Sequence, residues 1–383
     1  MSGFSRRIVV SGFSRTTGVH MTWKLVVIVA TLATAATVST QVLSTPKATP
    51  GEKGLTQVAG LKVGHFTLSE RPTGCTVVLL DGAGAVGGIS QRGAAPGTRE
   101  TDLLDPLNMV ERVNAIVLTG GSAYGLDAAQ GVVRYLEEHK TGYPIAGTVV
   151  PIVPAAVLMD LGFGGSSSIR PTADCGYRAA TSATDGPVAE GNIGAGAGAT
   201  VGKLLGSRDR AMKAGLGSAS ISLPGGLVVS AIAAVNAVGD VIDPSTGTVV
   251  AGVRTADGKT LADARLLLRS PLPSRNAPRP GGNTTLAIVA TNARLTKSEI
   301  NRVALMADDG LSRAVSPSHT TGDGDTVFSL ATATWQGQAD VTTIGALAAD
   351  ALSEAIVRAA VHATSSGGLP AARDLGTVPS RFK

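Results

Sequence analysis

The residues of this sequence with the clearest chemical potential are Asn283 and Thr284, which lie at an abrupt boundary in the chain. Residues 251–282 are rich in Arg, Lys, Asp, Gly and Pro and predict an exposed loop, because Pro removes backbone donors and Gly adds conformational entropy. The apolar run Leu286–Ala290 follows at once and predicts a buried strand. A threonine hydroxyl at such a boundary can attack the preceding carbonyl. An acyl shift and hydrolysis would then free an α-amine on Thr284, and an amine with a pKa of about 8 can accept the hydroxyl proton.

Four other polar residues are candidates to assist this chemistry. Lys203 ends a Gly-rich apolar run, where partial burial would lower its pKa. Asn236 ends an apolar strand, and a buried amide must find partners or cost roughly 1–3 kcal/mol. Asp323 and Asp325 flank a glycine just before another strand, a pattern that is also typical of an ordinary turn. Together with Thr284 these residues indicate an amide chemistry that needs no histidine.

Better-known motifs fail on spacing. A P-loop would need Gly at Ala197 and Ser or Thr at Leu204, and the same run does not fit the G-x-G-x-x-G fingerprint. The segment Gly120–Gly125 resembles a nucleophile elbow around Ser122, but Tyr124 stands where the second Gly belongs, and no later histidine completes a convincing triad. A cap at a helix start explains that serine more simply. The five histidines form no metal-binding motif, so we expect no metal and no cofactor.

Regular elements must position these residues. Thr296 and Glu299 form a capping box that predicts a helix through Arg313. Thr285 lies one residue further along the predicted strand than Thr284, so its side chain should point away from that of Thr284. A mixture of strands with few, long helices favours an α/β layered sandwich. Further strands are predicted over Thr76–Leu80, Ala115–Leu118, Leu227–Val235 and Thr326–Thr332, and further helices over Leu107–Val113, Gly125–His139 and Ile344–Ala363.

Composition and charge narrow the class of protein. The chain has 43% hydrophobic residues and 49 glycines, which is typical of a globular protein in which small residues pack closely. The net charge of +5 comes entirely from residues 1–50, which carry basic residues and no acid, so the remainder is neutral and gives no electrostatic case for nucleic acid. Cys75 and Cys175 are expected to be buried free thiols, with a disulfide as the alternative in an exported protein.

Residues 1–50 are interpreted as a signal or anchor segment with a linker. Lys24 precedes the apolar run Leu25–Val38, and a run of about 14 residues suits a signal-peptide core better than a membrane span of roughly 20. We therefore predict export or membrane anchoring through residues 21–45. A cytoplasmic protein whose start has been misassigned is the alternative.

The segments Val58–His65, Thr119–Leu126, Gly191–Gly196 and Asn283–Thr285 occur in this order. Together they resemble the DmpA-type aminopeptidase family, which includes β-peptidyl aminopeptidases and nylon-oligomer hydrolases. The resemblance extends from Gly54 to Gly376. It implies a single αββα sandwich domain, shared with ornithine acetyltransferases. It also implies self-cleavage into residues 51–283 (alpha subunit) and 284–383 (beta subunit), and a homotetramer of processed protomers.

The resemblance also implies roles for individual residues. Thr284, freed by cleavage after Asn283, matches the family nucleophile, which is Ser in other members. Asn236 matches an asparagine that serves the oxyanion, and Lys203 matches a lysine near the nucleophile. A tyrosine near the active site of relatives falls around Phe163 here, so the second oxyanion donor is left open.

Asp323 and Asp325 match paired polar positions that are Ser and Glu in the peptidase members, which brings the chain closer to the amidase branch. We expect a self-processing peptide or amide hydrolase that acts on a small peptide or oligo-amide. An acyltransferase of the ornithine acetyltransferase type and a non-catalytic oligomeric binding protein are the alternatives. The substrate stays open among α-peptides, β-peptides, D-amino-acid amides and ω-amino-acid oligomers.

Overall fold

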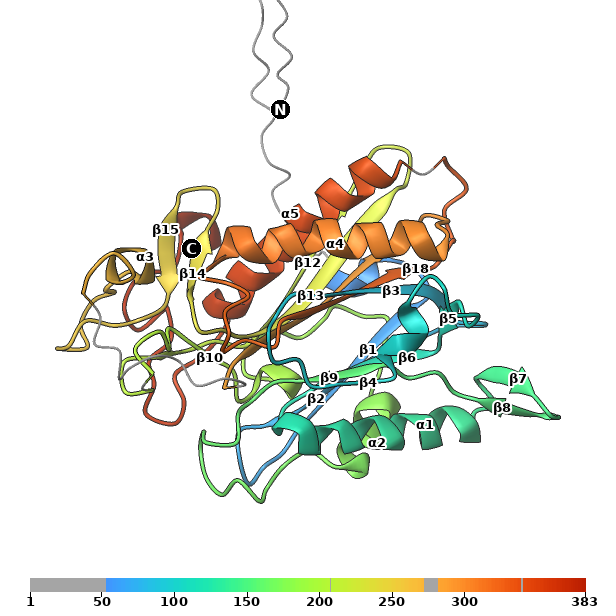
Figure 1. The fold of residues 1–383 in the computed structure, drawn as a ribbon, viewed down its shortest axis with the longest axis horizontal. Coiled ribbons are helices and arrows are strands. Elements are labelled where there is room, and N and C mark those ends of the chain that lie inside the picture. Colours follow the sequence, from blue (N-terminus) through green and yellow to red (C-terminus); the bar gives the residue numbers. More distant parts are fainter. Residues whose placement is uncertain (1–52, 207, 272–281, 339) are drawn as a thin grey trace, which may run out of the picture. The chain divides into compact units, whose positions relative to one another are not determined.

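Two β-sheets form the centre of the fold (Figure 1). The computed structural model describes residues 53–206, 208–271, 282–338 and 340–383. One sheet has the strand order β1 (Leu61–Thr67), β2 (Gly74–Leu80), β6 (Ala115–Thr119), β9 (Ala155–Val157) and β4 (Thr98–Arg99). The other has the order β12 (Leu216–Ser222), β13 (Val228–Asn236), β16 (Thr284–Thr291), β18 (Thr326–Ala331), β3 (Ala85–Gln91) and β5 (Arg112–Val113).

Helices cover the outer face of each sheet. The six-stranded sheet is covered by α4 (Lys297–Ala314) and α5 (Val341–Val361), and the five-stranded sheet by α1 (Ala128–Glu138) and α2 (Ala173–Thr181). The four layers, visible from top to bottom of Figure 1, confirm the expected αββα sandwich. Smaller elements are the sheet of β14 (Asp240–Asp243), β15 (Thr248–Ala251) and β17 (Val315–Ser316), the strand pairs β7 (Tyr143–Ile145) with β8 (Thr148–Val150) and β10 (Thr200–Val201) with β11 (Met212–Lys213), the helix α3 (Ala264–Leu267), and 3₁₀ turns at Gly54–Gln57, Thr101–Leu104, Ser122–Asp127, Gly194–Gly196 and Ser380–Phe382.

Side-chain alternation along β16 divides its residues between two cores. Leu286 and Ile288 pack between the two sheets, whereas Ala287 and Val289 pack toward α4 and α5. By the same period of two, Thr284 belongs to the face between the sheets and Thr285 to the helix-covered face. The expectation that these two threonines point in opposite directions is confirmed.

Glycine lets the helices of each layer approach closely. A Cβ added at Gly310 of α4 would lie 2.1 Å from the carbonyl oxygen of Ala349 in α5. A Cβ added at Gly131 of α1 would lie 1.7 Å from the carbonyl oxygen of Ala173 in α2. No side chain fits at these distances, which explains part of the high glycine content.

The helix predicted over Leu107–Val113 is wrong. Leu107 and Met109 are 93% and 87% exposed, and only Arg112–Val113 is regular, as a strand. Asp105 accepts a hydrogen bond from the backbone N–H of Leu107 at 2.8 Å. A local side-chain acceptor of this kind stabilises a turn in place of a helix. Pro106, between Asp105 and Leu107, suits a turn as well as a first helical turn.

The loop predicted over residues 251–282 is only partly irregular. Its described part contains α3 and is tied to the fold by the buried Asp240, whose carboxylate accepts from the N–H groups of Val253 at 2.8 Å and Ala264 at 2.7 Å. Sequence composition could not reveal this distant partner. Residues 272–281 lie outside the described part.

The prediction of free thiols is also wrong, because Cys75 of β2 and Cys175 of α2 form a disulfide. Their burial was expected, and the disulfide was only the alternative, because the pairing across 100 residues of sequence depends on the packing of α2 on β2.

The prediction of export or membrane anchoring through residues 21–45 is corrected as well. No helix in the described part of the chain is long and apolar enough to cross a bilayer. Residues 21–45 themselves, like the rest of the predicted leader, lie outside that part.

Candidate active site

The site forms where two neighbouring strands and one turn meet in the six-stranded sheet. Asn236, the last residue of β13, pairs directly with Thr284, the first residue of β16. Directly opposed residues of antiparallel strands extend their side chains on the same face, so both face the space between the sheets. On the other side of β16, Asn283 bridges to Asp323 in the turn before β18. The sequence-predicted residues Asn236, Asn283, Thr284, Asp323 and Asp325 are thus brought together.

The Asn283–Thr284 peptide bond is buried, with the two residues 4% and 3% exposed. The Thr284 hydroxyl donates to the carbonyl oxygen of Asn283, the residue that precedes it. The backbone N–H of Gly324 donates to the same oxygen at 3.0 Å. A Cβ at Gly324 would lie 2.9 Å from the Thr284 hydroxyl and 2.4 Å from the carbonyl oxygen of Ala95, so glycine is required here. The carbonyl therefore has both a nearby nucleophile and a fixed donor.

Asp323 is held by the backbone around it. One carboxylate oxygen accepts from the N–H of Val238 at 3.1 Å, and the other accepts from the Thr320 hydroxyl at 2.5 Å and from the Thr320 N–H at 3.2 Å. Burial, and then the nearby charge of Asp325, raise the pKa of Asp323 to about 6. Asp323 thus holds the turn that supplies the Gly324 N–H.

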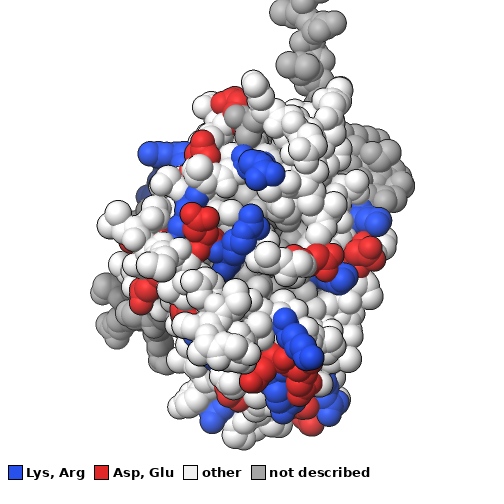
Figure 2. Space-filling view, turned by 90° about the vertical axis from the view of Figure 1, so that its right-hand side faces the viewer, with Lys and Arg blue, Asp and Glu red and all other residues white. Residues whose placement is uncertain are grey.

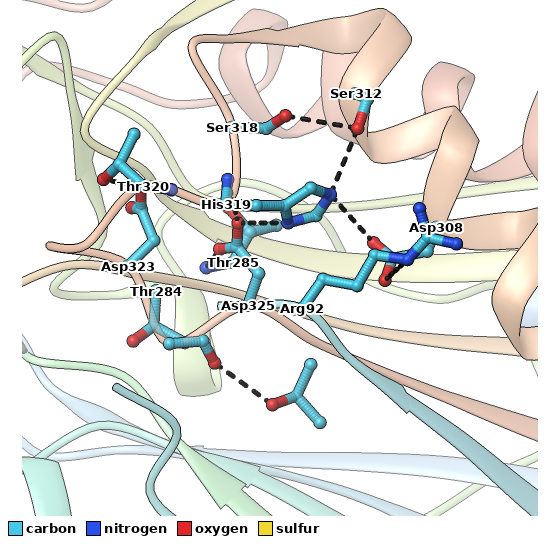
Figure 3. Close-up of polar contacts among 12 residues, drawn as sticks. Arg92, Thr284, Thr285, Asp308, Ser312, Ser318, His319, Thr320, Asp323 and Asp325 are labelled. Carbon is cyan, nitrogen blue, oxygen red and sulfur yellow. Dashed lines mark hydrogen bonds and ion pairs between the residues drawn. The ribbon is translucent and has the colours of Figure 1, made fainter. Parts of the chain in front are cut away.

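Asp325 lies on the other side of the Thr284 backbone (Figure 3). Its Oδ1 accepts from the Thr285 N–H at 2.8 Å. Its Oδ2 accepts from the His319 N–H at 3.0 Å and lies 3.0 Å from His319 Nδ1. His319, one of the histidines after Ser122 that completed no convincing triad, was not predicted as a site residue. Its spacing of six residues from Asp325 gives no periodic signal, since both belong to irregular chain.

Lys203 and Asn236 form a second buried group. Lys203 Nζ donates to Asn236 Oδ1 at 2.7 Å and to the Asn236 carbonyl oxygen at 3.1 Å. The N–H of Thr200 donates to the same Oδ1 at 3.1 Å, and Asn236 Nδ2 donates to the carbonyl oxygen of Met159 at 3.0 Å. Burial, and next the positive charge of Arg208, lower the pKa of Lys203 well below its usual value. The Lys203 burial expected from its Gly-rich surroundings is confirmed.

The orientation of Asn236 follows from these contacts. Lys203 and Thr200 fix the amide oxygen, so the amide nitrogen points the other way. An amide nitrogen carries two hydrogens, and the Met159 carbonyl uses one of them. The Met159 carbonyl does not use the second hydrogen.

A buried ion pair that the sequence did not reveal supports the neighbouring segment. Arg71 and Asp160 lie 2.9 Å apart with fully buried side chains. Asp160 also accepts from the Thr73 hydroxyl at 2.6 Å and from the N–H of Gly121 at 2.9 Å. Asp160 directly follows Met159. The Arg71–Asp160 ion pair therefore fixes the Met159 carbonyl group that accepts from Asn236.

Phe163 packs away from the nucleophile. It is buried with Ala211 and Leu369, and its ring lies 5.9 Å from the ammonium group of the buried Lys213. Lys213 donates to the carbonyl oxygens of Gly196, Ala199 and Ala214, and burial lowers its pKa to about 7. Phe163 therefore takes no part in the contacts at Thr284.

The described part contains no cluster suited to a metal ion, and the face shown in Figure 2 has no basic patch suited to nucleic acid. No group of three or more His, Cys, Asp or Glu side chains among the described residues is arranged to hold a metal ion. The face seen in Figure 2 carries Lys and Arg beside Asp and Glu, without a patch of one sign. That face gives no electrostatic basis for nucleic-acid binding.

Comparison with known sequences identifies related hydrolases. The profile of peptidase family S58 matches residues 53–372. An uncharacterized aminopeptidase of Mycobacterium leprae is 42% identical over 351 residues, which cover 82% of this chain and 92% of the relative. A 6-aminohexanoate-oligomer endohydrolase of Paenarthrobacter ureafaciens is 30% identical over 315 residues, which cover 78% of this chain and 84% of the relative.

Solved structures agree on the fold. A Burkholderia sp. beta-aminopeptidase superposes with a TM-score of 0.64 at 22% identity and covers 88% of this chain and 95% of its own. The L-aminopeptidase D-Ala-esterase/amidase of Ochrobactrum anthropi, described as a variant of the Ntn hydrolase fold, gives a TM-score of 0.61 at 19% identity, covering 84% and 90%. With the profile match over most of the chain, these comparisons show that the chain belongs to peptidase family S58, the DmpA-type aminopeptidases, and is a peptide or amide hydrolase.

Proposed function

We propose that the chain cleaves itself between Asn283 and Thr284 and then hydrolyses peptide or other linear amide bonds with the freed Thr284. The observation that carries the proposal is the Asn283 carbonyl, which accepts from both the Thr284 hydroxyl and the Gly324 N–H. A buried peptide bond with a hydroxyl nucleophile and a backbone donor has the groups that an acyl shift requires.

Self-cleavage proceeds in two steps. The Thr284 oxygen attacks the carbonyl carbon of Asn283, and the Gly324 N–H stabilises the negative charge on the carbonyl oxygen. The C–N bond then breaks, and the proton released by the Thr284 hydroxyl passes to the nitrogen, which becomes the α-amine of Thr284. Water hydrolyses the resulting ester, which leaves a carboxylate on Asn283 and restores the Thr284 hydroxyl.

Hydrolysis of a substrate repeats this chemistry with an external amide. The α-amine of Thr284 accepts the hydroxyl proton as the oxygen attacks the substrate carbonyl. Asn236 donates its second amide hydrogen to the oxyanion, an interaction typically worth about 3–4 kcal/mol in the transition state. Lys203 fixes that amide through Asn236 Oδ1. Asp323 and Asp325 orient the new amine or hold a cationic substrate terminus.

A matched pair of variants tests the nucleophile. Thr284→Val and Thr285→Val each remove one hydroxyl and keep the side-chain shape. Thr285 Oγ is buried without a hydrogen-bond partner among the described residues, so its loss should cost little. We expect Thr284→Val to abolish the fragment that begins at Thr284, on a denaturing gel and by mass spectrometry, and Thr285→Val to retain it. A wild-type chain that stays whole while hydrolysing amides would contradict the proposal.

The relatives favour hydrolysis over the alternatives. The curated relatives described above are named as an aminopeptidase and an amide-oligomer hydrolase, which supports transfer to water rather than to ornithine or another amine. Peptides with a free N-terminus and ω-amino-acid oligomers are the first substrates to assay. The homotetramer stays a prediction of the family resemblance, and light scattering on purified protein would check it.

A further inference from the structure

A chain of polar contacts links helix α4 to the start of β16 through His319 (Figure 3). On the strand side, the backbone N–H of His319 donates to Oδ2 of Asp325 at 3.0 Å, and the ring Nδ1 lies 3.0 Å from the same oxygen. Asp325 Oδ1 in turn accepts from the Thr285 N–H at 2.8 Å. His319 thus fixes one end of a carboxylate whose other end holds the backbone next to Thr284.

On the helix side, His319 Nε2 lies 3.4 Å from Asp308 Oδ1 and 3.1 Å from the Ser312 hydroxyl. The Asp308 side chain is fully buried, and its Oδ1 has no hydrogen bond among the described residues. Its other oxygen accepts from the Ser90 hydroxyl at 2.7 Å and lies 3.5 Å from Arg92 Nε. A carboxylate can only accept, so the protonated imidazole is the form that donates toward both acids at once.

The backbone of His319 is consistent with this bridging position. His319 has a φ of 52°, in the left-handed region that costs a residue with a side chain roughly 1–2 kcal/mol. In this conformation the backbone N–H and the ring of one residue both reach the same oxygen of Asp325. The contacts with Asp325 offset the backbone cost.

We propose that His319 is a positioning residue for cleavage of the Asn283–Thr284 bond. It fixes Asp325, and Asp325 holds the Thr285 N–H on one side of that bond. The N–H of Gly324, the residue before Asp325, holds the Asn283 carbonyl on the other side. His319 does not contact the reacting atoms and acts through this turn. The inference rests on the proposed self-cleavage and adds a second requirement to it.

The charges around the ring set its pH dependence. Burial disfavours the charged ring, but the hydrogen bond to Asp325 and the negative charge of Asp308 outweigh burial and the positive Arg92, and the pKa of His319 is raised. A raised pKa means that the bridge is intact below the ordinary value of 6.5 and is lost as the pH rises through the higher value in the folded protein. Self-cleavage of the wild-type chain should therefore slow on the alkaline side.

The test uses full-length chains made by cell-free translation, with the Thr284 fragment quantified over time at several pH values. His319→Ala should slow cleavage roughly 10- to 100-fold, the usual effect of a small misplacement of reacting groups. His319→Asn should recover more rate than His319→Gln, because an Asn amide lies near Nδ1 and Asn tolerates a positive φ. Both amide variants should lose the alkaline decline. Ser312→Ala, which keeps the Asp325 contact, is the control and should cleave at close to the wild-type rate.

Two outcomes would overturn the inference. One is cleavage of His319→Ala at the wild-type rate. The other is equal slowing of the Asn and Gln variants with an unchanged pH profile, which would indicate a merely structural role. If His319→Ala does not fold, the comparison of Asn with Gln and the wild-type profile still decide. Failure of Thr284→Val to block cleavage would instead refute the proposed function, so the two failures are distinguishable.

Discussion

Around the Asn283–Thr284 bond, each residue of the Asp323–Gly324–Asp325 turn has a separate task. Asp323 ties the turn to the backbone of Val238 and Thr320, the glycine gives its N–H to the Asn283 carbonyl, and Asp325 holds Thr285. Two acids around a glycine are usually no more than a turn. In the proposed self-cleavage, the turn itself is the functional unit, because it aligns the groups on both sides of one peptide bond.

The pKa of Asp323 leads to a prediction for self-cleavage. With a pKa of about 6 in the folded chain against 3.8 for a free Asp, the carboxyl becomes protonated as the pH falls through about 6. Protonation replaces one acceptor with a donor and loosens the turn. We expect the rate of fragment formation to fall below pH 6, measured by pulse-chase on nascent chains. The precursor has no α-amine at Thr284, so this acid limb reports Asp323 without interference from the amine.

Asp323→Asn is the companion variant. It cannot titrate, so its slower cleavage should be independent of pH between about 4 and 7. An unchanged acid limb in this variant would assign the titration to another group. The raised pKa also means that the folded state binds this proton more tightly than the unfolded chain. The contribution of Asp323 to the free energy of unfolding is therefore present in full below pH 3.8 and is lost as the pH rises toward 6.

At the residue scale, the sequence predicted the residues near the proposed cut but not the residues that hold them in place. Asn236, Thr284 and Asp323 stand beside strands whose apolar patterns are plain, so their positions followed from the strands. His319 and Asp160 lie in irregular segments, and their partners are set only by the packing of α4 and of the segment after β9. No local spacing encodes such contacts.

At the scale of elements, segments with a clear apolar periodicity were predictable. Segments in which a turn competes with a helix were not. The capping box of α4 is present, with the Thr296 hydroxyl and the Glu299 side chain each satisfying the other's backbone N–H. The predicted strands over β2, β6, β13, β16 and β18 also correspond closely to the observed ones. The helix expected at Leu107 is wrong, and Ser122, expected as a helix cap, is instead the first residue of a 3₁₀ turn in which Gly121 occupies the N-cap position. At Leu107, the side chain of Asp105 supplies the turn-forming contact that replaces the expected helix.

The cap of α4 gives a prediction that separates folding from chemistry. Thr296→Ala removes the acceptor for the Glu299 N–H and should lower the free energy of unfolding by about 1 kcal/mol. Asp308 and Ser312 lie three to four turns further along the helix, roughly 18 Å or more away. Cleavage at 25 °C should therefore be unchanged. Chemical denaturation and a cleavage time course on the same sample would check this, and a large loss of cleavage would show that α4 transmits end fraying to the site.

At the scale of the whole molecule, the proposed cut passes through the middle of a sheet. In the six-stranded order, β16 and β18 come from the part after residue 283, and β12, β13, β3 and β5 from the part before it. The later part thus supplies two central strands flanked on both sides by the earlier part. It also supplies α4 and α5, which cover them.

The disulfide gives a prediction at this scale. Cys75 and Cys175 both precede the cut, so reduction should not change the two fragments seen on a denaturing gel, and both should elute together under native conditions. Replacing both cysteines with Ser removes a constraint across 100 residues and should cost on the order of 4 kcal/mol by loop entropy. Differential scanning calorimetry of the cleaved protein, with and without reductant, would measure the loss. An unchanged melting temperature would mean that the bond adds no constraint beyond the packing of α2.

The interleaving of strands also changes the molecularity of folding. An uncut chain that unfolds can return to its native sheet alone, at a rate independent of concentration. Once cut, an unfolded molecule consists of two separate polypeptides, and β16 and β18 must find a partner that holds an open place between β13 and β3. If the proposed cut occurs, the precursor folds as one chain, whereas the two fragments can recover from unfolding only by a second-order association. The proposed self-cleavage would therefore make refolding depend on protein concentration, whereas the first folding of the uncut chain would not.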